Sequence, residues 1–312
     1  INATYNEILD NNKINLNIQI SESEKIYVEK INIYGNYITN ENVIRNVIIT
    51  DEGDPFNEIL FKKSVNNIKS KNIFSSVETE VYDGSEKQLK TIDIIVEEKP
   101  TGEIAAGAGT GTSGSSISFA VSENNYLGKG EKIKLNAVLS DTSIEGMFSI
   151  SNPNFRNSDK SLSASVETTK EDLMGKYGYK TNKTGFTFGT KFEQYKDIYF
   201  SPNISSYFES LETSSKATAA KKKQEGDYFD TNFSYSISLN KLNQNFQPTE
   251  GYRSTFYQTL PLIADDLSIS NSYEFAKYNK FGDDTIFSTI FFIKSINSLD
   301  DEDVRISNRI FI

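Results

Sequence analysis

The sequence contains no cysteine, no histidine and no tryptophan. Without cysteine the chain has neither a disulfide framework nor a thiolate metal site, and without histidine the usual zinc sites and His-dependent catalytic triads are excluded. Long apolar runs are also missing, since no stretch approaches the roughly 18 apolar residues that a membrane-spanning helix needs. We therefore expect no helical membrane protein, no metal site, no cofactor and no catalytic residues.

Acidic residues exceed basic ones, with 43 Asp and Glu against 33 Lys and Arg in 312 residues and a formal net charge of −10. Nucleic-acid binding depends on basic side chains that neutralise phosphates, so we expect no nucleic-acid partner. Aromatic residues are abundant instead, with 21 Phe and 17 Tyr. A β protein accommodates them, either as a soluble fold or as a membrane β-barrel, and the length allows two domains.

The first hundred residues carry the pattern of a small α+β module. Alternating apolar residues predict strands at 13–20 and 26–33, and we assign residues 1–24 to the end of a preceding domain. After the second strand two amphipathic helices are expected, one capped by Thr39 or Asn40 and one starting at Asp54-Pro55. Further strands at 77–82 and 91–98 complete the order strand, helix, helix, strand, strand over residues 25–99.

From residue 100 to 312 the pattern changes to strands alone, because apolar residues alternate with small or polar ones and no helical periodicity returns. Eleven strands are predicted, most of them near the roughly 9 to 11 residues that cross a membrane at a tilt. Short turns alternate with longer polar loops, expected at 171–183 and 211–227, as is typical of membrane barrels. A soluble β-sandwich remains the alternative.

The stretch Glu103–Gly111 is rich in glycine and has two possible interpretations. A Gly-rich loop can bind phosphate at the start of a helix, but here no helix follows and another strand begins near residue 115. Glycine inside a strand adds no side chain and costs backbone entropy. The sequence thus favours a weakly packed strand over a nucleotide site.

In residues 25–98, Gly35-Asn36 follows the first strand and Asn72-Ile73-Phe74 precedes the next one. These motifs resemble those of the outer-membrane assembly factors typified by BamA, whose last polypeptide-transport-associated (POTRA) domain has Gly-Phe-Phe at the second place. Three later turns resemble turns of the family's barrel in the same order. Their residues include Asn125, Leu127, Gly128 and Gly130, then Asn152, Pro153 and Phe155, and finally Pro248 and Gly251.

The resemblance implies a POTRA domain followed by an incomplete antiparallel transmembrane β-barrel, with about eleven of sixteen strands present. It also implies a location in the bacterial outer membrane, with the POTRA domains in the periplasm. The family's Arg-Gly-Phe motif and closing strands are then expected beyond residue 312, and we interpret the chain as an internal piece of a longer protein.

The resemblance implies that two strands form the functional sites. The first barrel strand would act as a lateral gate that pairs with substrate strands, and comprises Glu103, Ile104, Ala105, Ala106, Gly107, Ala108, Gly109, Thr110 and Gly111. The second POTRA strand would offer an edge for β-augmentation, and comprises Val77, Glu78, Thr79, Glu80, Val81 and Tyr82. Expected partners are unfolded outer-membrane proteins, lipoprotein subunits of an assembly complex, and outer-membrane lipids including lipopolysaccharide.

Two other functions remain open at the level of sequence. A two-partner secretion or TamA-like translocation channel of the same superfamily would carry similar POTRA modules and a similar barrel. A soluble β-rich enzyme or adhesin would have to work without His or Cys, and no convincing carboxylate pair stands out. The insertion of barrel proteins into the outer membrane, without enzymatic chemistry, is the function that the resemblance favours.

Overall fold

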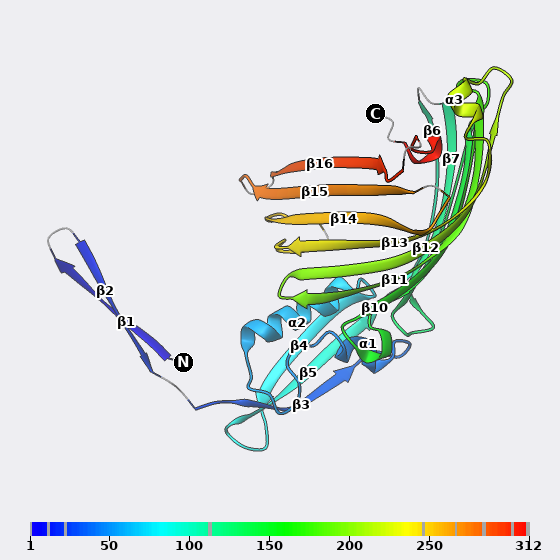
Figure 1. Cartoon of the computed structure of the whole chain (residues 1–312). Helices are drawn as coiled ribbons and strands as arrows, with labels where there is room; N and C mark the ends of the chain where they lie inside the picture. The colour runs from blue at the N-terminus through cyan, green and yellow to red at the C-terminus, as the bar shows by residue number, and fades with distance from the viewer. Residues whose placement is uncertain are drawn as a thin grey trace. The chain divides into compact units, whose positions relative to one another are not determined.

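The computed structural model of the chain describes residues 2–10, 13–21, 24–111, 114–244, 247–265, 267–282, 285–300 and 303–309. The chain forms two compact units (Figure 1). Unit 1 comprises Ile1–Tyr37 and Val47–Lys99, and unit 2 comprises Ile38–Asn46 and Pro100–Ile312. In the described part of the chain, no helix is long and apolar enough to cross a membrane.

Unit 1 contains a β-hairpin and a small mixed sheet. The hairpin pairs β1 (Asn2–Asp10) with β2 (Lys13–Ser21), of which only the second was predicted from the sequence. The mixed sheet has the order β3-β5-β4, with β3 (Tyr27–Tyr34) parallel and β4 (Phe74–Asp83) antiparallel to the central β5 (Leu89–Glu98). Helix α2 (Glu58–Ser70) contacts β4.

Alternating side chains of this sheet and one face of α2 make an apolar core. The central strand β5 buries three alternating residues, as expected for a strand that is covered on one face. Helix α2 contributes residues seven apart, which lie on one side of a helix. The buried apolar residues of unit 1 are Val28, Ile31, Phe61, Ile68, Ile73, Phe74, Val77, Ile92, Ile94 and Val96.

The start of α2 differs from its predicted cap, whereas α1 (Glu41–Arg45) begins directly after Asn40, one of its two predicted caps. The Asn57 side chain caps α2 by accepting from the amides of Ile59 and Leu60, whereas Asp54-Pro55 was expected to do so. Helix α1 has Asn40 in the N-cap position but without a side-chain capping bond. Thr39, the other predicted cap, instead uses its hydroxyl in a contact with a later turn.

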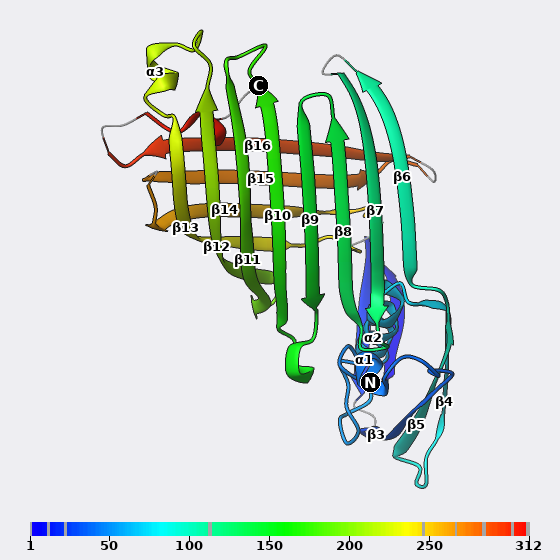
Figure 2. The same ribbon diagram turned by 90° about the vertical axis from the view of Figure 1, so that its right-hand side faces the viewer.

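Unit 2 is built around one antiparallel sheet, which has eleven strands in the described residues (Figure 2). Each strand pairs with its neighbours in chain order, so β6 and β16 are the two ends. The strands are β6 (Gly102–Gly111), β7 (Gly114–Tyr126), β8 (Glu131–Ser140), β9 (Ser143–Asn152), β10 (Ser161–Leu173), β11 (Tyr179–Tyr195), β12 (Ile198–Thr213), β13 (Gly226–Asn240), β14 (Gly251–Ile263), β15 (Ser268–Lys280) and β16 (Ile286–Ser298).

The prediction of an α+β module followed by an eleven-stranded antiparallel sheet is confirmed over the described residues. Two polar loops were predicted too long. Strand β10 continues to Leu173 and strand β11 begins at Tyr179, so their connection is much shorter than the expected 171–183. The β12–β13 connection contains a short helix, α3 (Ala219–Lys222). Polar residues in these regions extend the strands, because a strand end that reaches water needs no apolar face.

Candidate functional site

Strand β6 forms one end of the sheet and has a single neighbour, β7, among the residues that the structure describes. The pairing register runs from Gly102 opposite Glu123 to Gly111 opposite Gly114. Every residue of β6 is exposed to solvent. One whole side of its backbone therefore presents amide and carbonyl groups that no described strand satisfies, which is the property of an edge that can accept another strand.

The side chains of β6 are small, and this limits how firmly the strand is held. Of the ten residues in β6, four are glycine and three are alanine. A Cβ atom at Gly111 would find no heavy atom within 4 Å, and one at Gly109 would only just reach the Ser116 hydroxyl. Cross-strand side-chain contacts are the main source of sheet stability, so β6 is held chiefly by its backbone hydrogen bonds to β7.

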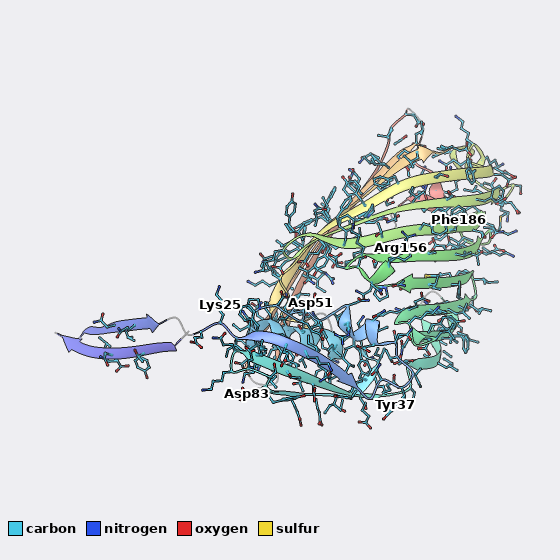
Figure 3. The ribbon with its side chains drawn as sticks, turned by 90° about the horizontal axis from the view of Figure 1, so that it is seen from below. Lys25, Tyr37, Asp51, Asp83, Arg156 and Phe186 are labelled. Carbon is cyan, nitrogen blue, oxygen red and sulfur yellow. The ribbon has the colours of Figure 1, made fainter. Side chains whose placement is uncertain are left out.

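The sheet has one apolar and one polar face, which the register keeps separate from β6 through β15, whereas β16 carries exposed apolar residues on both sides, such as Phe291 and Phe292. Phe119 of β7 lies opposite Ala137 of β8, and Phe188 of β11 lies opposite Ile204 of β12. The apolar face is exposed over a wide area, and Phe186 from it is labelled in Figure 3. Its exposed large residues include Ile104, Ile117, Phe119, Leu135, Leu139, Ile144, Phe148, Ile150, Leu162, Val166, Phe186, Phe188, Ile204, Phe208, Phe229 and Ile237.

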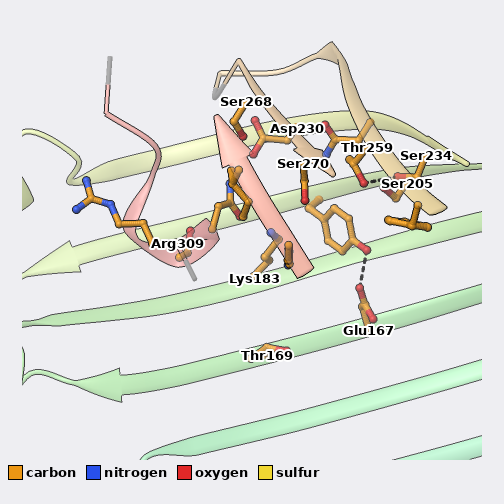
Figure 4. Close-up of a pocket in the computed structure, with 17 residues that line it drawn as sticks. Glu167, Thr169, Lys183, Ser205, Asp230, Ser234, Thr259, Ser268, Ser270 and Arg309 are labelled. Carbon is orange, nitrogen blue, oxygen red and sulfur yellow. Dashed lines mark hydrogen bonds between the residues drawn. The ribbon is translucent and has the colours of Figure 1, made fainter. Parts of the chain in front are cut away.

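The polar face is concave, because a cavity of about 500 Å³ is lined by residues from β10 through β16 on this face. Figure 4 shows its lining, in which Lys183, Asp230 and Arg309 are drawn around the same space. Tyr207 donates a hydrogen bond of 2.6 Å from its hydroxyl to a carboxylate oxygen of Glu167. An apolar outside and a polar, concave inside are the arrangement of a membrane barrel wall.

A short segment after β16, residues 303–309, is fixed to the polar face by a buried arginine. Arg305 donates to Asp230 at 2.6 Å and to Glu209 at 3.1 Å, and all three side chains are less than a tenth exposed. The Arg305 guanidinium carbon lies 3.7 Å from the centre of the Tyr228 ring. Next to it, Ile306 packs with Tyr179 and Leu211, with Leu173 and Tyr228 at the margin of this cluster.

The turn residues that carried the family resemblance adopt tight backbone geometries. Leu127, Gly128 and Gly130 all have positive φ. In the second turn, the Asn152 side chain accepts from the Asn154 amide at 3.0 Å, after Pro153, and Phe155 begins a 3₁₀ turn. In the third turn, which follows Pro248, a Cβ at Gly251 would lie 2.1 Å from the Lys241 carbonyl oxygen.

In unit 1, β4 lies at an end of its sheet and pairs only with β5 among the described strands. Residues Val77 to Tyr82, predicted as an edge, lie within β4. The turn pair Gly35-Asn36 directly follows β3, and a Cβ at Gly35 would lie 1.9 Å from the Val96 carbonyl oxygen. Both predicted strand sites therefore lie at sheet ends, although in different units.

The group of Arg305, Glu209 and Asp230 was not predicted from the sequence. Arg305 lies 75 positions from Asp230 and 96 from Glu209, and it stands in an acidic stretch that looks like a solvated loop. The sequence did contain one signal for this group, which is a carboxylate on the polar side of each of two neighbouring strands. Recognising that the two carboxylates are close requires the strand register, which places Asp230 opposite Tyr207, two residues from Glu209.

Comparison with known proteins identifies both parts of the chain. The family model described as the Omp85 superfamily domain matches residues 125–312, and the POTRA model, described as surface antigen variable number repeat, matches residues 26–99. The outer membrane protein assembly factors BamA of Nitratidesulfovibrio vulgaris and Neorickettsia risticii are 22% and 24% identical, over 90% and 97% of this chain. The chain spans 36% and 41% of the length of these two relatives.

Solved structures agree on the fold. BamA from Haemophilus ducreyi lacking POTRA domains 1–3 superposes with a TM-score of 0.70 at 18% identity, covering 98% of this chain and 62% of that one. CdiB from Escherichia coli superposes with a TM-score of 0.58 at 10% identity, covering 94% and 58%. The protein is thus located in the bacterial outer membrane, with its POTRA part in the periplasm. The chain belongs to the Omp85 superfamily, as a POTRA module followed by part of an outer-membrane β-barrel.

Proposed function

We propose that this chain is part of an assembly factor that folds β-barrel proteins into the outer membrane, with β6 as its lateral gate. The observation that carries the proposal is the Gly- and Ala-rich edge strand at the end of an amphipathic sheet. The alignment with BamA proteins over nearly the whole chain supports it. The work is done without enzymatic chemistry.

The physical basis is the cost of unpaired backbone groups in lipid. Hydrocarbon offers no hydrogen-bond partners, so an exposed strand edge in the membrane is unfavourable until another strand pairs with it. A substrate strand supplies these partners, and the small side chains of β6 place little steric demand on it. Folding of the substrate then provides the free energy, and no nucleotide is required.

The second edge, β4 of unit 1, is proposed to bind strands in the periplasm by β-augmentation. Backbone pairing gives affinity with little sequence specificity, which suits a protein that handles many unfolded chains. Unfolded outer-membrane proteins and lipoprotein subunits of an assembly complex are the partners proposed for this edge. Outer-membrane lipids, including lipopolysaccharide, would surround the apolar face of the sheet.

A photo-crosslinking residue at three positions tests the gate in the full-length protein. Ala106 lies in the edge strand β6, Ala164 lies on the same apolar face in the interior strand β10, and Ser163 lies beside it on the polar face. During assembly of a substrate barrel we expect crosslinks from position 106 and none from position 164. Crosslinks from position 163 alone would instead support a translocation channel, and assembly without any crosslink at 106 would contradict the gate.

A further inference from the structure

The segment Ile38–Asn46 belongs to unit 2, where it contacts the turn between β7 and β8. The Asn125 side-chain amide donates to the Thr39 hydroxyl at 2.8 Å, and both residues are buried, with 8% and 2% of their surface exposed. The backbone amide of Asn40 donates to the Gly128 carbonyl at 2.8 Å. The segment is therefore joined to this turn by a buried side-chain bond and a backbone bond.

The same asparagine organises the turn and connects it to the start of β6. The Asn125 side-chain oxygen accepts from the Gly130 amide at 2.8 Å, and the Asn125 amide donates to a carboxylate oxygen of Glu123 at 2.7 Å. That same Glu123 oxygen accepts a short hydrogen bond from the hydroxyl of Thr101, the residue immediately before β6. Hydrogen bonds thus run without interruption from Thr101 through Glu123 and Asn125 to Thr39.

Two glycines of the turn are required by the closeness of this contact. A Cβ at Gly128 would lie 2.0 Å from the Ile38 carbonyl oxygen, and one at Gly130 would lie 2.8 Å from a methyl carbon of Val43. Both glycines also have positive φ, of 69° and 68°. The spacing Asn-x-x-Gly-x-Gly at 125–130 therefore serves the contact with Ile38–Asn46 as well as the turn itself.

We propose that Thr39, Glu123 and Asn125 are positioning residues that form a clamp at the Gly102 end of β6. The clamp fixes the start of the edge strand and the β7–β8 turn to the segment Ile38–Asn46. The opposite end of β6, at Gly111, is held by pairing with Gly114 and carries no side chain. If β6 acts as the proposed gate, it opens from its Gly111 end and pivots about its clamped start.

Hydrogen exchange of the full-length protein in lipid tests where β6 is held. In the Asn125→Ala variant we expect the amides at 102–104 to exchange about three to ten times faster, as loss of one or two hydrogen bonds implies, with those at 109–111 unchanged. Thr39→Val removes the hydroxyl without touching the turn and should give the same pattern. Unchanged exchange at 102–104 in both variants would overturn the clamp.

Asn243→Ala is the matched control for loss of a turn-forming asparagine. Asn243 accepts from the amides of Thr249 and Glu250, each at 3.2 Å, and so organises the β13–β14 turn much as Asn125 organises its own. We expect this variant to leave exchange at 102–104 at the wild-type rate. Equal acceleration by Asn243→Ala would mean that general loosening of the sheet, and not the clamp, causes the effect.

A steric test uses Gly130→Ala and its rescue. The new methyl group would press on Val43, so we expect slower substrate assembly and faster exchange at 102–104, partly restored when Val43→Ala makes room. Gly282→Ala is the control for positive φ alone, because Gly282 has φ 79° with nothing within 4 Å of its Cβ position. If Val43→Ala does not rescue Gly130→Ala, and Gly282→Ala slows substrate assembly equally, the steric part of the clamp is overturned.

These experiments separate the clamp from the gate. If the wild-type protein assembles substrate and crosslinks at position 106, while all clamp variants match it in exchange and assembly, the clamp is wrong and the gate stands. If the wild-type protein gives no crosslink at 106, the gate is wrong. Altered exchange at 102–104 would then still identify the clamp as a structural link, without the proposed pivot.

Discussion

A buried arginine between two carboxylates makes the attachment of residues 303–309 sensitive to single substitutions. Arg305→Ala would leave Glu209 and Asp230 buried on the polar face without their cation. Breaking a buried pair in this way costs about 3 to 5 kcal/mol, because the remaining charges stay desolvated. We expect the segment to detach and the Ile306 amide, which donates to the Gln224 side chain at 3.0 Å, to lose its exchange protection.

Arg309→Ala is the control for this prediction. Arg309 approaches Asp303 at 3.8 Å, with 41% and 77% of the two side chains exposed, and exposed pairs contribute at most about 1 kcal/mol. Its loss should leave the Ile306 amide protected. Equal exposure of that amide in both variants would show that the buried charges are not what holds the segment.

Glu29 of β3 gives the connection between β4 and β5 a defined dependence on pH. Its carboxylate accepts from the Ser85 hydroxyl at 2.6 Å and from the Ser85 amide at 2.8 Å, and these hydrogen bonds hold the pKa of Glu29 below the ordinary value of 4.5. A lowered folded-state pKa means that the contribution is complete above pH 4.5 and is lost as the pH falls through the folded pKa. The Ser85 amide should therefore exchange faster in acid, relative to its intrinsic rate, and Glu29→Gln should remove most of that dependence.

Among the elements, the edge strand β6 is the proposed gate, and on that proposal its stability sets the rate of substrate assembly. Glycine lowers strand stability by roughly 0.5 to 1 kcal/mol relative to a residue with a side chain. A Cβ at Gly109 would lie 3.9 Å from the Ser116 hydroxyl, so the Cβ of valine fits there without a clash. We expect Gly109→Val to strengthen pairing of β6 and to slow assembly about two- to fivefold in a reconstituted insertion assay.

Gly146→Ala provides a comparison within the interior of the sheet. Gly146 lies in β9, where a Cβ would meet the Thr168 methyl group at 3.3 Å. Because β9 has neighbours on both sides, the proposed opening of β6 would leave the pairing of β9 unchanged. Assembly rates should stay near the wild-type value, and equal slowing by both substitutions would argue against β6 as the rate-determining element.

The elements of this chain follow from its sequence to different degrees. Alternation predicted all eleven strands of the described sheet, because a strand with one apolar and one polar face has an unambiguous period of two. The start of α2 was misplaced because residues 54–56 pair with the beginning of β3: the Asp54 carbonyl accepts from Val28, and the Phe56 amide donates to Ile26. Such pairing lies beyond local sequence rules.

The edge strand β6 and the contact between Asn125 and Thr39 also differ in how far the sequence predicts them. The glycines of β6 indicated a weak strand, and its position at a sheet end followed from its place as the first strand of the array. Asn125 was identified as a turn residue, yet its bond to Thr39 joins positions 86 apart. A side chain that organises its own turn gives no sign of a second partner, so the clamp emerged only from the structure.

At the scale of the whole molecule, the separation of the two faces determines whether the sheet can enter a membrane. Phe188 of β11 is 57% exposed on the apolar face, and its neighbour Thr187 lies on the polar face. A lysine on the lipid-facing side of a barrel costs about 2 to 4 kcal/mol at mid-membrane. Phe188→Lys should therefore reduce the folded, outer-membrane fraction of the full-length protein.

Thr187→Lys should be tolerated, because β11 already carries Lys183 and Lys191 on the polar face, each four residues away. The two variants add the same charge at adjacent positions. A difference between them therefore reports the effect of the sheet face and not of the charge itself. The measurement is the fraction of protein that reaches the outer membrane in folded form. Equal losses would mean that the apolar face does not meet lipid, and the barrel-wall assignment of this strand would have to be reversed.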